Sequence, residues 1–336
     1  MAVKLTVTKS GSGADSTATI APSNQQQYLR KCALTVVSGT QALDLSALRI
    51  RFNVNQSDLQ TPNNAVIRIF NLSDRTANQI DKEFQKVTLS AGYQNGPFGV
   101  IFAGEIKQVR KGRINATDTY FDILAADNDL GYNQGVIKQT LAKDWTSRDV
   151  LDNAVVAMGV TPGYIDTMTA GAASRGKVQY GMARDQIRNL ARSQQFSWSV
   201  QDGKLQTVRN TSYIPGAVVR LNAQSGAVIV PEQTQGGITV RCLLNPALRV
   251  GGALQINNAS IQRAFLGQEY LYLEGRIRQD ILDAELPKIS NDGLYRIYVL
   301  DYSGDTRGQE WYANIVCMAI DKSAPIASSV KAAATQ

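Results

Sequence analysis

The feature of this sequence that most restricts its fold is an alternation of apolar and polar residues with a period of two. Leu48, Ile50, Phe52 and Val54 are apolar, whereas positions 49, 51 and 53 hold Arg, Arg and Asn. Because successive side chains of a strand point to opposite faces, this pattern predicts a strand with one buried face. Similar runs occur at 33–37, 65–70, 87–93, 100–109 and 119–125.

One helix is predicted within this β-rich part of the chain, between the runs at 65–70 and 87–93. Ser73 is a suitable N-cap and Asp74 suits the first turn. The apolar residues that share one side of the predicted helix are Ala77, Ile80 and Phe84. A series of strands with one flanking helix indicates a β-barrel or a curled sandwich over residues 28–130.

Two helices and a hairpin are predicted over residues 131–216. Thr146 or Ser147 precedes a stripe of apolar residues at helical spacing, which stops at Gly159. A second helix is expected over 182–194, and Asp202-Gly203 favours a hairpin turn after it. We therefore expect a compact α+β domain here.

Strand patterns return over 217–322, at 238–244, 253–256, 294–300 and 311–320. The segment 257–292 is inserted between two of these strands, and insertions of this length usually carry a function or order against a partner. The predicted fold class is mainly β with an α+β insert, in which two similar β-rich domains flank the small α+β domain. Residues 1–27 and 323–336 are rich in small and polar residues and are predicted to be a flexible arm and tail.

The absence of histidine restricts the chemistry of this chain of 336 residues. It removes nucleophiles activated by histidine, the usual zinc ligands and the usual proton shuttle near neutral pH. Cys32, Cys242 and Cys317 lie far apart with apolar neighbours, which predicts buried free thiols and excludes a CxxC site. We predict no metal and no cofactor.

An enzyme without histidine would need paired carboxylates. The candidate pairs are Asp127 with Asp129, Asp280 with Asp283, and Asp301 with Asp305. Their spacing does not distinguish them from the acidic residues of turns and helix surfaces. No catalytic set emerges, and we predict that the chain is not an enzyme.

The formal net charge of +7 raises the question of binding to nucleic acid. The densest basic groups lie at 30–31, 107–113 and 184–192, and none forms a basic tail, which favours dispersed, solvated charge. No apolar run reaches the roughly 18 residues expected of a spanning helix. No apolar stretch follows Lys4 and Lys9 as in a secretory signal, so we expect assembly in a cytoplasm.

Several stretches of the sequence form a specific pattern. Residues 231–234 read Pro-Glu-Gln-Thr, 237–246 read Gly-Ile-Thr-Val-Arg-Cys-Leu-Leu-Asn-Pro, and 249–252 read Arg-Val-Gly-Gly. Further on, 303–308 read Ser-Gly-Asp-Thr-Arg-Gly and precede Glu310-Trp311-Tyr312 and Cys317. Together they resemble the second barrel of phage baseplate hub proteins of the late control protein D type. Residues 66–73, 87–93 and 102–106 resemble the first barrel of tail hub and tube proteins.

This resemblance, which covers most of residues 28–322, implies a fold and a role. The fold would consist of two tail-tube-like β-barrels flanking the small α+β domain. Three chains would give six barrels around a lumen, so that a trimer could join a hexameric tail tube to a trimeric central spike. The implied partners are a homotrimer, the tail tube and spike proteins, the tape measure protein, other baseplate subunits, and DNA in transit. The implied location is the virion, in the baseplate of a tail that we expect to be contractile.

Candidate partner contacts lie in the insertion and at the end of the N-terminal arm. In the insertion they are Phe265, Tyr270, Tyr272 and Arg276, and at the end of the arm Tyr28. A solvated loop is the competing interpretation of both segments. Competing functions are another tube-like tail component such as a distal tail protein, a cell-wall hydrolase carried on the tail, and a DNA-binding module.

Overall fold

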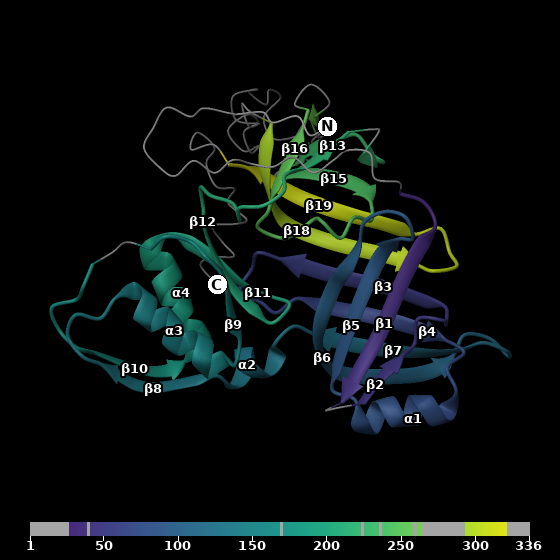
Figure 1. Cartoon of the computed structure of the whole chain (residues 1–336), viewed down its shortest axis with the longest axis horizontal. Helices are drawn as coiled ribbons and strands as arrows, with labels where there is room; N and C mark the ends of the chain where they lie inside the picture. Colours follow the sequence, from purple (N-terminus) through teal and green to yellow (C-terminus); the bar gives the residue numbers. More distant parts are fainter. Residues whose placement is uncertain are drawn as a thin grey trace, which may run out of the picture.

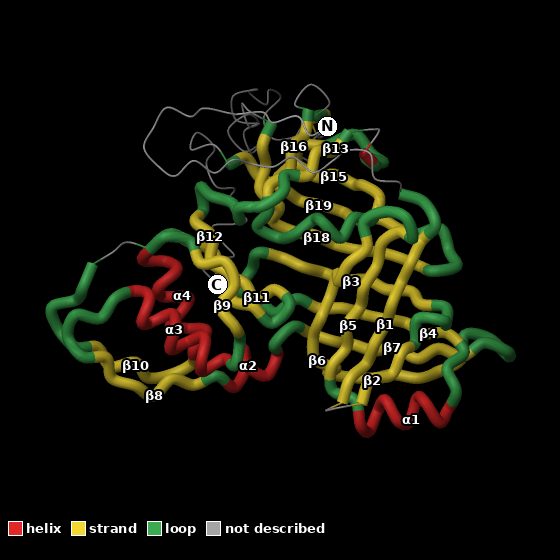
Figure 2. The backbone as a smooth tube through the Cα atoms, in the orientation of Figure 1, coloured by secondary structure: helices red, strands yellow, loops and turns green. Residues whose placement is uncertain are grey.

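The computed structural model describes residues 27–38, 41–168, 171–222, 225–234, 237–257, 261–263 and 293–320. Strands predominate in these residues, and helices are few (Figure 2). The prediction of a mainly β chain is therefore confirmed.

The first β block consists of the strands β1 to β7 and the helix α1. Its strand β3 (Ile50–Ser57) buries Ile50, Phe52 and Val54 completely and exposes the residues between them, as the alternation predicts. The observed strand begins at Ile50, two residues later than expected. The other strands of the block are β1 (Arg30–Ser38), β2 (Gln41–Asp44), β4 (Asn64–Phe70), β5 (Lys86–Tyr93), β6 (Phe98–Arg113) and β7 (Thr119–Ala126).

The helix α1 (Asp74–Glu83) begins directly after the predicted N-cap Ser73. The hydroxyl of Ser73 accepts a hydrogen bond from the backbone N–H of Thr76 at 3.2 Å. Ala77 and Ile80 are buried against the sheet core, and Phe84 follows directly after the last turn. The apolar side of the helix therefore packs as expected.

The middle segment, from α2 to β12, forms three layers (Figure 1). The helices α3 (Ser147–Met158) and α4 (Ala183–Gln194) lie between a two-stranded ribbon and a three-stranded sheet. The ribbon is made of β8 (Val136–Leu141) and β10 (Lys177–Met182). The sheet has the order β11 (Phe196–Gln201), β12 (Lys204–Arg209), β9 (Thr161–Ile165), and the short helix α2 (Asp129–Gln134) leads into the segment.

Local sequence signals explain the helix and turn boundaries of the middle segment. Thr146 and Asp149 form a reciprocal capping box at the start of α3, and Gly159 ends the helix with a left-handed φ of 64°. Asp202 and Gly203 have φ values of 52° and 74°, the conformation of the tight turn predicted between β11 and β12. The ribbon, α2 and β9 were not predicted.

The second β block contains the strands β13 to β19. Its longest strand, β18 (Leu294–Asp305), pairs with β19 (Trp311–Ala319) on one side. On the other side it pairs with β3 of the first block, in register from Val299 opposite Ser57 to Asp305 opposite Arg51. The remaining strands are β13 (Val219–Leu221), β14 (Glu232–Thr234), β15 (Gly237–Leu243), β16 (Ala253–Ile256) and β17 (Gln262–Arg263).

The pairing of β3 with β18 joins the two β blocks into one continuous sheet of fourteen strands. The main path runs from β17 through β15, β18, β3 and β6 to β2. No closed barrel is detected among the described strands, so the structure does not confirm the two-barrel architecture. The two β-rich parts of the chain are joined by direct hydrogen bonding between β3 and β18.

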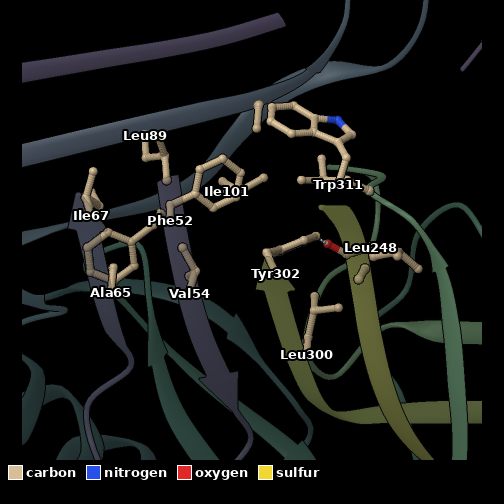
Figure 3. Close-up of a cluster of buried hydrophobic side chains, with 14 of the residues drawn as sticks. Phe52, Val54, Ala65, Ile67, Leu89, Ile101, Leu248, Leu300, Tyr302 and Trp311 are labelled. Atoms are coloured by element: carbon tan, nitrogen blue, oxygen red, sulfur yellow. Dashed lines mark hydrogen bonds between the residues drawn. The ribbon is translucent and has the colours of Figure 1, made fainter. Parts of the chain in front are cut away.

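A single hydrophobic core lies beneath this sheet and contains residues of both β blocks (Figure 3). Phe52 of β3 meets Trp311 of β19 edge to face, with ring centroids 5.5 Å apart. The Tyr302 hydroxyl of β18 donates to the carbonyl oxygen of Leu248 at 3.1 Å. The two blocks therefore share both strand pairing and buried apolar surface.

The middle segment has a hydrophobic core of its own, separate from the core of the sheet. It combines Ile137 of the ribbon, residues of both helices, and Trp198 of the three-stranded sheet. In the part of the chain that the structure describes, no helix has the length and apolar character needed to cross a membrane.

Candidate functional site: a polar junction between the two cores

A buried ion pair lies where the middle segment meets both β blocks. Arg296 of β18 pairs with Asp58, and their side chains are 3% and 2% exposed. The hydroxyl of Ser197 on β11 donates to Asp58 Oδ2 at 2.8 Å, and Arg296 Nη1 donates to the carbonyl oxygen of Arg209 at 2.8 Å. One pair of charges thus connects the first block, the middle segment and the second block.

Burial raises the pKa of the Asp58 carboxyl, whereas Arg296 and Ser197 lower it. Because a buried charge without a partner is costly, the ion pair and its hydrogen bonds must form together. The groups can do so in one relative orientation of the three parts, since hydrogen bonds weaken steeply when their angles change. This pair is therefore suited to fixing an orientation.

A second set of contacts links the first block to the turn end of β11. Asn63 Nδ2 donates to the carbonyl oxygen of Val200 at 3.0 Å and to Gln201 Oε1 at 2.8 Å. Gln201 Nε2 in turn donates to the carbonyl oxygen of Ser57 at 3.0 Å. Asn63 is buried, so these bonds satisfy polar atoms that water cannot reach.

The hairpin turn of the middle segment makes the third set of contacts. The backbone N–H of Gly203 donates to Asp127 Oδ1 at 2.9 Å, and Arg249 of the second block pairs with Asp202 at 3.3 Å. Burial raises the pKa of Asp127 to about 7, and the neighbouring acids Asp202 and Glu105 add to the effect. Asp127 therefore changes charge close to neutral pH.

We call these residues the polar junction. They share a position between the two hydrophobic cores, and their contacts are directional and mostly buried. The members are Asp58, Asn63, Asp127, Ser197, Gln201, Asp202, Arg249 and Arg296.

The polar junction has the chemistry of a joint rather than that of a catalytic centre. Asp127 and Asp129, which are close in sequence, have different partners, because Asp129 pairs with Lys107 at 2.8 Å. Asp305 pairs with Arg49 at 2.7 Å, and Asp280 with Asp283 lies outside the described residues. Among the residues that the structure describes, no group of three or more acidic or cysteine side chains could hold a metal ion.

The motif at 303–308 spans the end of β18 and the start of the loop that joins it to β19. Asp305 is buried, and the Arg49 guanidinium donates to both of its carboxylate oxygens, at 3.1 and 2.7 Å. The backbone N–H groups of Arg307 and Gly308 each donate to Asp305 Oδ1 at 2.9 Å. Although burial alone would raise the pKa of Asp305, these donors hold it below its ordinary value.

This loop also receives the start of the first strand. Arg30 of β1 donates to the carbonyl oxygen of Gln309 at 2.8 Å and lies over the Trp311 ring. Asp305 therefore organises this loop and ties it to Arg49 of the first block.

The motif at 237–252 has a comparable structural role. Its alternate residues Val240, Cys242 and Leu244 are buried in the sheet core. Pro246 lies close to Gly99 of β6, so that a Cβ added at Gly99 would be 3.5 Å from the proline ring. The motif thus packs the second block on the first.

The predicted free thiols are confirmed at all three positions. Cys242 and Cys317 are buried, and burial raises the pKa of Cys242 to about 12. Cys32 packs against the sheet core but is only half-buried, so the predicted full burial is wrong at this position.

The structure describes one of the five candidate partner contacts, Tyr28. Tyr28 is half exposed and lies beside the exposed Leu29, just before β1. Phe265, Tyr270, Tyr272 and Arg276 lie outside the described residues. These contacts remain predictions, and none of them belongs to the polar junction.

Sequence reasoning missed the polar junction. Its members are single polar residues distributed over many strands and turns, and their partners lie up to 238 positions away, as between Asp58 and Arg296. One local signal was available: Arg296 interrupts an otherwise apolar and aromatic strand, which indicates a buried charge that needs a partner.

Among known proteins, solved structures of similar fold were found, whereas no sequence match was. No protein-family model matches the sequence, and no curated protein matches it. The structure is similar to that of a tail protein of prophage MuSo2 from Shewanella oneidensis, with a TM-score of 0.53 and 9% identity, over 86% of this chain and 98% of that one. It is also similar to a tail protein from Neisseria meningitidis, with a TM-score of 0.54 and 8% identity, over 86% and 96%. At such low identity, the similarity shows a shared fold.

Proposed function

We propose that this chain is a structural subunit of a phage tail, and that it serves as the baseplate hub. In this role a trimer joins the hexameric tail tube to the trimeric central spike and lines the path of the tape measure protein and DNA. The protein acts mechanically, without catalysis, and its place is the virion.

The observation that carries this proposal is the extent of the shared fold. The similarity to two tail proteins, one of them from a prophage, takes in 86% of this chain and nearly the whole of each of theirs. The likeness therefore applies to the arrangement of both β blocks and the middle segment rather than to one common domain. The residue patterns at 231–252 and 303–312 favour the hub over other tail components, because they resemble hub proteins in particular.

The joined β blocks suit a protein that connects a ring of six subunits to a trimer. A hexameric ring presents six equivalent surfaces, and a trimer can match them only if each chain offers two. Two β blocks held by strand pairing and a common core would keep those two surfaces at a fixed spacing. The polar junction would hold the middle segment at a fixed angle to them.

Light scattering on the purified chain tests the proposal, alone and after mixing with the tube and spike proteins of the same particle. We expect three copies of the chain in the particle: a mass three times that of the chain alone, or, when the spike protein is required, that mass plus the mass of the bound spike. Stacking of this complex on tube protein should depend on the trimer. A chain that stays monomeric with both partners would contradict the adaptor role, and glycan cleavage by the pure protein would contradict a purely structural one.

A further inference from the structure

The ribbon of β8 and β10 packs one face against the helices of the middle segment. Ile137 is 3% exposed and Gln179 is 0% exposed, and both belong to the side that covers α3 and α4. Asn153 of α3 donates to Gln179 Oε1 at 2.7 Å. The inner face of the ribbon is therefore packed and hydrogen-bonded.

The outer face carries apolar side chains that nothing in the described structure covers. Val178 and Tyr180 of β10 are each 72% exposed, and Val136 of β8 is 44% exposed. In the register of the ribbon Tyr180 lies opposite Lys138, and Val178 lies opposite Thr140. A solvated ribbon usually alternates polar residues on this face, so three large apolar groups on one small surface indicate a contact.

The free edge of β8 is open to another strand. The ribbon has two strands, and among the described strands β8 pairs with β10 alone. Gln139 points to the inner side, yet it is exposed, which shows that the helices do not reach over this edge. An unpaired strand edge offers N–H and C=O groups that readily bind a further strand.

The charge of the ribbon indicates what kind of strand would bind. The ribbon strands, 136–141 and 177–182, contain Lys138 and Lys177 and no acidic residue, and Lys143, Asp144 and Arg175 lie just beyond their ends. Lys138, Lys143 and Arg175 make no ion pair within the described part of the chain. A strand that places a carboxylate opposite Lys138 would gain a cross-strand pair of opposite charge.

We propose that the edge of β8 is a docking site for an extended acidic segment of another protein of the particle. The segment adds to the ribbon as a third strand, with an acidic side chain opposite Lys138 and apolar side chains opposite Val136 and Thr140. Tyr180 and Val178 then form the neighbouring row of the enlarged face. This proposal depends on the ribbon alone and does not require the hub assignment.

An anionic membrane is a less suitable occupant of the same surface. The apolar and basic residues would fit such a surface. However, inserting the edge of β8 into lipid would leave its backbone N–H and C=O groups without partners, whereas a strand satisfies them. The unpaired edge therefore favours a protein segment.

The first test is fluorescence polarisation of the full chain with a short labelled peptide. In this probe, Val, Glu and Val occupy one face of the strand, and Ser and Asp occupy the other. A matched peptide has Lys in place of every acid. We expect the acidic peptide to bind and the basic peptide not to bind. We also expect Lys138→Glu to weaken binding of the acidic peptide roughly fivefold or more, since attraction becomes repulsion.

Two controls make the result specific. Lys82→Glu reverses an exposed lysine on α1, far from the ribbon in sequence, and should leave binding unchanged. Two further peptides carry methyl groups on the backbone nitrogens of alternate residues, one peptide for each of the two alternating sets. Methylating the set of N–H groups that faces β8 should abolish binding, whereas methylating the other set should preserve it. Equal loss with both sets would contradict strand addition.

Three outcomes would overturn the proposal. The first is failure of the acidic peptide to bind at millimolar concentration, with circular dichroism showing that the chain is folded. The second is self-association of the chain that Lys138→Glu abolishes, because the occupant would then be a second copy. The third is binding to phosphatidylglycerol vesicles, but not to the peptide, that the same substitution abolishes.

Discussion

Replacing Arg296 with methionine removes the charge from the centre of the polar junction and retains much of the side-chain volume. Asp58 would then be a buried carboxyl without its partner, and the carbonyl oxygen of Arg209 would lose a donor. Breaking one member of a buried pair costs about 3–5 kcal/mol. With an unfolding entropy of about 2.1 cal/mol/K per residue, a chain of 336 residues should lose roughly 4–7 °C in melting temperature.

Urea unfolding followed by tryptophan fluorescence measures this loss and locates it. Trp198 lies in the core of the middle segment and Trp311 in the core of the sheet. In a background with Trp145→Phe, replacing one or the other by phenylalanine makes the signal report on the remaining core. We expect coincident transitions without the Arg296 substitution, and an earlier transition at Trp198 with it, because the junction no longer couples the cores.

Matched variants separate the ion pair from a general effect of removing arginine. Arg220→Met removes an exposed strand arginine that donates to Gln255 and should cost less than about 1 kcal/mol. Combining Arg296→Met with Asp58→Leu replaces both charges by apolar groups and should recover much of the loss. The reasoning would be refuted if Arg296→Met cost no more than Arg220→Met, or if the double variant were less stable than the single one.

Three further predictions concern Asp127, Asp305 and Gly304. The pKa of Asp127 is raised from 3.8 to about 7, so ionisation of this carboxyl opposes folding and the free energy of unfolding should fall as pH rises through this range. In urea titrations at several pH values, Asp127→Asn should lessen that fall. Asp305→Ala should cost about 1–3 kcal/mol in thermal unfolding by leaving loop N–H groups without an acceptor, whereas Arg49→Lys should cost less. Gly304→Ala places a Cβ 2.4 Å from the Phe52 ring and should cost about 1–3 kcal/mol, measured by urea unfolding against Gly216→Ala, where nothing lies within 4 Å.

Local patterns predicted the elements whose cause is local. The alternation at Ile50, Phe52 and Val54 gave a strand because one face of β3 is buried and the other is not. Thr146 and Gly159 marked the ends of α3 because caps satisfy backbone groups within a few residues. These features depend little on the rest of the chain.

Contacts between residues far apart in the sequence could not be predicted from local patterns. The pairing of β3 with β18 joins residues more than 200 positions apart, and either strand could have been an edge of its own block. The ribbon was missed because β8 buries a single residue, Ile137, so its pattern has no clear period. The polar junction needs the positions of three parts of the chain at once.

The two ways in which the parts are joined have different physical consequences. The β blocks share a large buried apolar surface, which gives stability, and the register of β3 with β18 fixes how they are aligned. The middle segment meets them through hydrogen bonds and ion pairs, which are specific for one geometry. The polar junction therefore determines the direction in which the ribbon of β8 and β10, on the far side of α3 and α4, points (Figure 1).

Binding of a strand to the ribbon and assembly with a larger partner should therefore respond differently when the polar junction is weakened. An acidic strand that docks on β8 contacts the ribbon alone, so Arg296→Met should leave the affinity of the labelled peptide unchanged while the chain is folded. A partner that must contact the ribbon and the β blocks at the same time would bind such a variant less well, because the entropy of fixing a loose joint opposes it. Equal loss of peptide binding and assembly would mean that the substitution unfolds the middle segment rather than releasing it.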